Sequence, residues 1–139
     1  MAVDTIIQQA AVIAGAIAGI TRAWDKAPES LNELPAVVII PSTGDVQYPR
    51  TPSLRQVDHS LKLLLFVSRS DLPQAETAAR PFIDLIIRTF DAHLTLNGAA
   101  VTSGITHYAY GKLTWGGVDY LGIDFLLRAV EREVGNYAP

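Results

Sequence analysis

The chain has 139 residues, a net charge of −3 and no cysteine. This length is typical of one domain, so we expect a single domain spanning residues 1–139. The lack of cysteine excludes disulfides, thiol nucleophiles and thiolate metal sites, and the net negative charge argues against a protein that coats nucleic acid. Charged residues make up 18% of the chain, below the usual fraction of about 25%. Together with a hydrophobic fraction of 49%, this predicts self-association.

The first segment is predicted to be a helix from about Thr5 to Ala23, with a capping box at residues 5–8. Gly15 and Gly19 lie four residues apart, and each glycine inside a helix costs about 1 kcal/mol relative to alanine. Their presence indicates close approach to another backbone, which is either the protein's own sheet or a neighbouring subunit. The apolar run at residues 10–20 is too short to span a bilayer, so no membrane partner is expected.

A short β-branched segment, Ala36–Ile40, is predicted to be a buried strand because a proline bounds it on each side. The polar stretch that follows has neither a helical nor a strand period, so we expect a long flexible loop at about 42–57. Residues 46–70 are locally basic and include Arg50 and Arg55. The loop is either a mobile surface segment or an arm that becomes ordered against an acidic partner. In the second case, charge reversal at both arginines is expected to weaken the association.

The strongest strand signal is Ser60–Val67, in which apolar side chains fall on both faces. Such a strand must be covered on both sides. A long helix is predicted from Asp71 to about His93, with a kink at Pro81. Its outer face carries two acid–base pairs four residues apart, Glu76 with Arg80 and Asp84 with Arg88.

The C-terminal third is predicted to consist of antiparallel strands. Asn97-Gly98 is the signal for a tight hairpin between residues 94–96 and 99–101. A second hairpin is predicted at Gly116-Gly117, between strands Ile105–Thr114 and Val118–Val130. Trp115, at its tip, is either an interface residue or an ordinary sheet aromatic. The fold class is therefore α+β, a mostly antiparallel sheet of about four to six strands packed against two main helices.

The sequence contains no recognisable catalytic, nucleotide-binding or metal-binding motif. The three histidines, His59, His93 and His107, are isolated and have no ligand-spaced partner. We therefore predict no catalytic residue, no cofactor and no metal site. An enzyme assembled from residues that are distant in sequence remains a minor alternative.

The order of elements resembles the tail-terminator (tail-completion or neck) proteins of long-tailed bacteriophages, the lambda-like minor tail protein family. The residues that carry this resemblance are the strand segment Leu34–Ile39, the apolar segment His59–Val67 and the segment Leu94–Gly98. The resemblance covers nearly the whole chain and is one of pattern, without a sharp motif. Related head–tail connector proteins fit the same pattern.

The resemblance implies a non-enzymatic virion protein that forms a homo-oligomeric ring, a hexamer in this family. It caps the tail tube and provides the surface that joins the head. The implied partners are copies of the chain itself, the tail-tube protein and a head-completion or connector protein. DNA would pass through the ring without sequence-specific recognition. The implied location is the tail–neck region of the virion, and the host cytoplasm during assembly.

Independent of the resemblance, two helices can cover only one face of a sheet that is apolar on both faces. We therefore expect the second face to be covered by a neighbouring copy in a head-to-tail ring. The candidate interface residues are Arg50, Arg55, Gly15, Gly19 and Trp115. An alternative is a dimeric α+β module that binds a small ligand in a cleft between the sheet and the helix kinked at Pro81.

Overall fold

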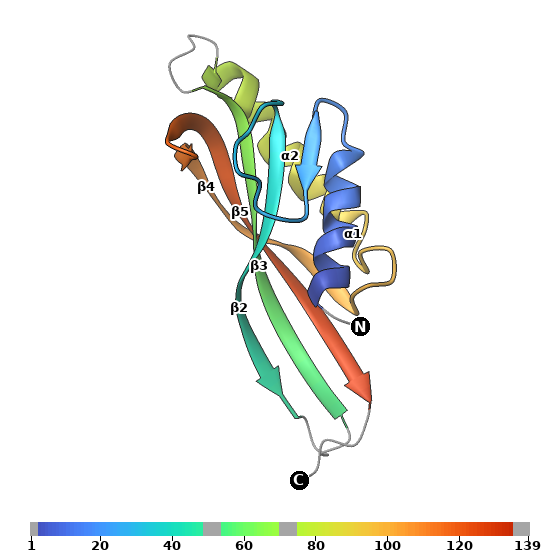
Figure 1. Ribbon diagram of the computed structural model, residues 1–139. Coiled ribbons are helices and arrows are strands. Elements are labelled where there is room, and N and C mark those ends of the chain that lie inside the picture. Colours follow the sequence, from blue (N-terminus) through green and yellow to red (C-terminus); the bar gives the residue numbers. More distant parts are fainter. Residues whose placement is uncertain (1–2, 49–53, 70–74, 135–139) are drawn as a thin grey trace.

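The protein is a twisted five-stranded sheet with two helices on one face, as the computed structural model shows (Figure 1). The structure describes residues 3–48, 54–69 and 75–134. Within them the elements are α1 (Val3–Gly15), β1 (Arg22–Trp24), β2 (Ala36–Gln47), β3 (Leu54–Arg69), α2 (Ala75–Asp91), β4 (Thr102–Trp115) and β5 (Val118–Val134). The strand order is β1-β2-β3-β5-β4, with β1 parallel to β2 and every other pair antiparallel. This confirms the predicted α+β fold with a mostly antiparallel sheet.

The main core lies between the helices and one face of the sheet, which we call the core face. The predicted alternation of β3 is confirmed, because Leu61, Leu63 and Leu65 are buried on this face. Ile123, Phe125 and Leu127 of β5 extend the same layer, and each pairs directly with a leucine of β3. The helices contribute fully buried Ile6, Ile86 and Phe90. Burial of such side chains at about 25 cal/mol per Å² is the main force that holds the helices on the sheet.

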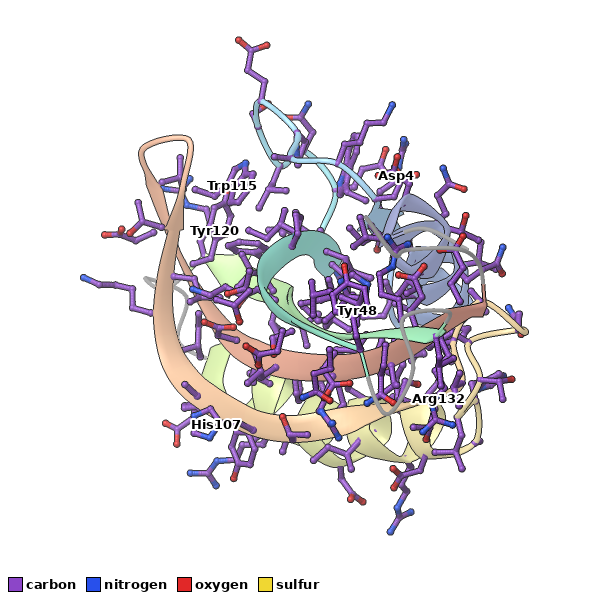
Figure 2. All side chains as sticks on the ribbon, turned by 90° about the horizontal axis from the view of Figure 1, so that it is seen from below. Asp4, Tyr48, His107, Trp115, Tyr120 and Arg132 are labelled. Atoms are coloured by element: carbon purple, nitrogen blue, oxygen red, sulfur yellow. The ribbon has the colours of Figure 1, made fainter. Side chains whose placement is uncertain are left out.

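The opposite face of the sheet, the outer face, carries a second apolar cluster. Ala36, Val38, Phe66 and Tyr120 are all buried there, and Leu31 from the segment between β1 and β2 packs on them. Seen from below, the β4–β5 hairpin curls toward this segment and brings Trp115 and Tyr120 inward (Figure 2). The expectation that a neighbouring copy must cover this face is therefore wrong for this half of the sheet. The chain supplies its own cover through the 25–35 connection.

The N-terminal helix is shorter than the sequence predicts. It ends at Gly15 rather than near Ala23, and Arg22–Trp24 forms a strand that pairs in parallel with residues 36–38. Gly19 lies outside the helix with φ +96°, a backbone conformation that favours glycine. Strand pairing across 14 residues of sequence outweighs the local helical period, so the predicted glycine stripe along one helix does not form.

The long flexible loop expected at about 42–57 is wrong for the described residues in that range. β2 continues to Gln47 and β3 begins at Leu54. The two strands pair from Thr43 opposite Ser60 to Gln47 opposite Gln56. A register shift between Pro41 and Thr43 lets β2 pass the proline and continue. Residues 49–53, with Arg50, lie outside the described residues.

The hairpin predicted at Asn97-Gly98 is also wrong. Residues 92–99 form a series of turns, and Leu96, Asn97 and Gly98 all have positive φ. The physical reason is packing, because Leu96 is fully buried in the main core and Ala99 and Ala100 join it. Tertiary burial selects compact turns that carry these side chains inward instead of an exposed two-stranded ribbon.

Two predictions for the second half of the chain are confirmed. The Gly116-Gly117 hairpin joins β4 to β5, and both glycines have positive φ as a tight primed turn requires. α2 covers Ala75–Asp91 with Pro81 inside it, and both predicted ion pairs form along its exposed face. Residues 70–74, where the sequence places its start, lie outside the described residues.

Candidate functional site

The candidate site is the end of the sheet that extends beyond both helices (Figure 1). We call it the distal arm and define it as Pro41–Gln47 of β2, Leu54–Ser60 of β3 and Arg128–Val134 of β5. These strands pair continuously, from Pro41–Leu61 through Gln47–Gln56 on one side of β3 and from Ser60–Arg128 to Leu54–Val134 on the other. Every residue of the β2 segment Pro41–Gln47 is exposed, whereas Ile40, which precedes it, is half-buried. The sequence missed the arm because prolines at positions 49 and 52 suggested a break.

Polar pairs join β3 to β5 on the core face of the arm. Arg55 Nη2 lies 2.5 Å from Glu133 Oε2, and His59 Nε2 lies 3.1 Å from Glu131 Oε1. The second pair is buried, with side-chain exposures of 14% for His59 and 6% for Glu131. The other carboxyl oxygen of Glu131 is buried and has no hydrogen-bond partner in the described part of the chain. Burial of the Glu131 carboxyl would cost free energy without a partner, and His59 supplies its hydrogen bond. The pair therefore links β3 to β5 where the main core ends.

A second polar network lies on the outer face of the arm. Arg128 donates to Asp58 at 2.8 Å, Gln56 donates to the same carboxylate at 3.1 Å, and Arg132 donates to Gln56 at 2.9 Å. The hydrogen bond from Arg128 lowers the pKa of Asp58, and this outweighs the opposing effect of burial. The network therefore ties β3 to β5 through charge-assisted hydrogen bonds.

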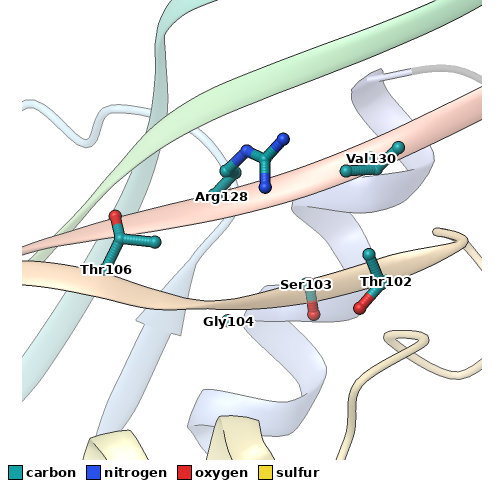
Figure 3. A pocket seen from close by; sticks show the side chains of 6 residues that line it. All are labelled: Thr102, Ser103, Gly104, Thr106, Arg128 and Val130. Carbon is teal, nitrogen blue, oxygen red and sulfur yellow. The ribbon is translucent and has the colours of Figure 1, made fainter.

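Arg128 also borders a shallow hollow between β4 and β5 (Figure 3). Its other walls include the hydroxyls of Thr102 and Thr106 and the bare backbone of Gly104. Because the guanidinium is already paired with Asp58 and the hollow holds only about 170 Å³, it is a weak candidate for a ligand site.

A larger groove lies between α2 and the edge strand β4. It is lined by Glu76, Arg80 and Ile83 of the helix and by Tyr108 and Tyr110 of the strand, and it measures about 390 Å³. This is the place where the sequence, through the kink at Pro81, predicts a cleft between helix and sheet. The groove is open and mostly apolar, with one acid–base pair at its rim.

The structure places the predicted interface residues in different parts of the molecule. Arg55 lies on the arm, paired with Glu133, so charge reversal there would set two carboxylates side by side and disturb the arm itself. A Cβ at Gly15 would lie 3.4 Å from the Ala23 Cβ of β1. A Cβ at Gly19 would lie 3.3 Å from the Phe82 ring of α2. Both glycines thus face the protein's own elements, and a role for them between subunits stays a prediction.

Trp115 acts within the chain, although the sequence also allowed an interface role. Its indole nitrogen donates to the carbonyl oxygen of Pro28 at 2.9 Å, and its ring meets Phe66 edge-to-face at 5.7 Å. The tryptophan therefore fastens the 25–35 segment over the outer face. Any contact that it makes with another copy would come in addition to this role.

Other classes of site find little support in the described residues. Within residues 3–48, 54–69 and 75–134, no three His, Asp or Glu side chains come together in a way that could hold a metal ion. Neither described helix combines the length and the apolar character needed to cross a membrane. Scans against protein-family models and curated proteins found no match.

Proposed function

We propose that the chain is a structural subunit of a homo-oligomeric ring in the tail–neck region of a bacteriophage virion, similar to the tail terminators. In this role it would cap the tail tube and present the surface that joins the head, without catalysing a reaction. Its partners would be further copies of itself, the tail-tube protein and a head-completion or connector protein. The proposal rests on the resemblance of the sequence pattern to that family and on an α+β fold of the kind that the resemblance implies.

The structural observation that favours assembly is the exposed distal arm. Three strands continue past the layer of helices (Figure 1). Val46 of the arm is 56% exposed, and Tyr48, which directly follows the β2 segment of the arm, is 54% exposed. An exposed strand edge with apolar side chains is a template for pairing that a stable monomer usually avoids. The arm is therefore suited to be covered by another protein surface, and in a ring a neighbouring copy is always available.

Measurement of the particle mass tests the proposal. Size-exclusion chromatography with light scattering should give a multiple of the 15.0 kDa chain mass, near 90 kDa for six copies, and negative-stain images should show rings. Val46→Lys should weaken the assembly, because it places a charge on the exposed arm. Val12→Lys is the matched control, since Val12 is 60% exposed on α1. A well-folded monomer at high concentration would overturn the proposed function.

A second candidate is a dimeric module that binds a small ligand, favoured by the groove between α2 and β4. Its volume of about 390 Å³ falls in the range of small-molecule pockets. The same mass measurement separates the two candidates, because this reading predicts two copies per particle. It also predicts that the apolar dye 8-anilinonaphthalene-1-sulfonate binds to the folded protein and that Tyr110→Ser removes this binding.

A further inference from the structure

The sheet has two edges where backbone hydrogen-bonding groups face no other strand. β1 pairs with β2 only along Ala36–Val38, so the distal part of β2, Pro41–Gln47, has β3 on one side and no described strand on the other. At the opposite edge, β4 pairs with β5 alone along Thr102–Trp115. These statements hold for the part of the chain that the structure describes. Each edge is long enough to accept an additional strand.

Both edges carry exposed apolar side chains on the core face of the sheet. Val46 pairs with Val57, which in turn pairs with Glu131, a residue in the alternating series of buried β5 side chains. At the other edge, Tyr108 pairs with Phe125 and is 44% exposed, and Tyr110 is 38% exposed. On β4 the two tyrosines are two residues apart, which is the spacing of neighbours on one face of a strand. Tyr48 follows Val46 by two residues, just beyond the end of β2, and is 54% exposed.

Strand direction makes the two edges compatible. β2 runs antiparallel to β3, β3 to β5, and β5 to β4, so β2 and β4 run in opposite directions. When copies repeat head to tail with their sheets side by side, β4 of one copy meets β2 of the next in antiparallel orientation. Val46 lies level with Glu131 of β5 and Tyr108 lies level with Phe125, six residues away along β5, so the strands must be inclined to the ring axis to bring the two side chains together. Antiparallel pairing favours contacts between aromatic and β-branched residues that lie opposite each other.

Coverage of the edges distinguishes the ways in which two copies can pair. Asp45 is the one charged side chain between residues 41 and 48, and Lys112 of β4 is already paired with Asp119 at 3.7 Å, so charge does not decide the pairing. Pairing of two β4 edges across a two-fold axis would leave the β2 edges uncovered. Pairing of β2 with β4 covers both edges in every copy.

We infer that Pro41–Gln47 of one copy adds as an antiparallel strand to β4 of the next copy, with Val46 and Tyr48 packed beside Tyr108 and Tyr110. The partner is therefore a second copy of this chain, held by main-chain hydrogen bonds between sheets. This inference rests on the proposed ring and specifies which surfaces close it.

Cross-linking between single-cysteine variants tests the pairing, because the chain has no cysteine of its own. Val46→Cys and Tyr110→Cys are purified separately, checked for folding by circular dichroism, mixed, reassembled and treated with a short bis-maleimide linker. The expected result is a covalent dimer in the mixture, at least tenfold above the yield from either variant alone. Val12→Cys mixed with Tyr110→Cys is the matched control and should give no more dimer than Tyr110→Cys alone.

Each other outcome has a distinct meaning. Efficient dimers from Tyr110→Cys alone would show β4 paired with β4 and would overturn the inference. Equal yields with Val12→Cys would also overturn it, since the contact would then be unspecific. If light scattering finds a ring and the mixture does not cross-link, the inference fails and the proposed function stands. If every variant and the unmodified chain are monomeric, both fail.

Discussion

Replacement of Gly122 by alanine is expected to destabilise the protein strongly. Gly122 lies in β5 opposite Phe66 of β3, next to the register shift between Phe66 and Ser68. A Cβ at this position would lie 2.1 Å from the carbonyl oxygen of Leu65 and 2.9 Å from Leu113 Cδ1. Contacts below 3.0 Å are essentially never seen for a real Cβ, and the first of these atoms belongs to the backbone. One of the two central strands must therefore move by about 1 Å, which disturbs the packing of both apolar clusters.

The size of the effect follows from the nature of the clash. Overpacking of a well-ordered core typically costs about 1–3 kcal/mol, and a backbone clash between central strands belongs at the upper end of that range. Alanine also lowers the conformational entropy of the unfolded chain, which by itself raises the free energy of unfolding by about 0.4–1 kcal/mol. We expect a net loss of about 2 kcal/mol in the free energy of unfolding. For a chain of this size, that corresponds to a fall of roughly 5–10 °C in melting temperature.

Gly111 provides the matched control, because it pairs directly with Gly122 across β4 and β5. A Cβ at Gly111 would meet no atom within 4 Å. Gly111→Ala should therefore leave stability unchanged or raise it by less than about 1 kcal/mol. Urea unfolding followed by circular dichroism at one fixed protein concentration measures both variants, since self-association would add to stability. If Gly122→Ala unfolds at the same urea midpoint as the parent, or if both variants lose the same amount of stability, the close approach of β3 to Gly122 is refuted.

Three further substitutions test the contacts described above. His59→Ala should lower stability by about 2 kcal/mol, because it leaves the buried carboxyl of Glu131 without its partner; a second substitution, Glu131→Gln, should recover part of the loss in urea unfolding. Arg128→Met should raise the pKa of Asp58, which can be measured by NMR titration of the side-chain carboxyl. Because the pKa of Asp58 is lowered in the folded protein, its contribution to stability is complete at pH values above 3.8, the ordinary pKa, and disappears as the pH falls through the folded-state pKa. The difference in the free energy of unfolding between the parent and Arg128→Met should therefore shrink in acid. Trp115→Phe should lower the free energy of unfolding by about 1–2 kcal/mol and increase proteolysis between β1 and β2, because it removes the hydrogen bond to Pro28. An unchanged cleavage rate there would contradict the role of the indole in holding the 25–35 segment on the sheet.

The parts of the fold that depend on local chemistry could be predicted from the sequence. The double glycine at Gly116-Gly117 specifies a tight turn, and the apolar alternation of residues 60–67 specifies a strand that is buried on both faces. The ion pairs along α2 follow from spacing on one helix. In each case the residues that determine the structure lie within a few positions of one another, so one stretch of sequence contains the information.

The errors in prediction share a different cause. Arg22 and Ala23 fall at the end of the predicted helix, but residues 22–24 form a strand because residues 36–38 offer them a partner. Leu96 takes a left-handed backbone conformation because burial in the main core outweighs its local cost. The distal arm forms because β3 finds β2 on one side and β5 on the other. Such pairings between distant segments leave no periodic trace within either segment alone.

The burial of the outer face changes the physical basis for the proposed assembly. The sequence suggested that a neighbour is needed to cover apolar area over the body of the sheet, but Phe66 and Tyr120 are already buried beneath the chain's own 25–35 segment. Within residues 3–48, 54–69 and 75–134, the two strand edges that face no other strand are narrower and more directional than such a face, and they carry a few large exposed side chains. A broad apolar face would bind many surfaces, whereas a strand edge restricts partners by direction and register. Assembly through edges would therefore give a defined geometry between copies, as a ring with a fixed number of subunits requires.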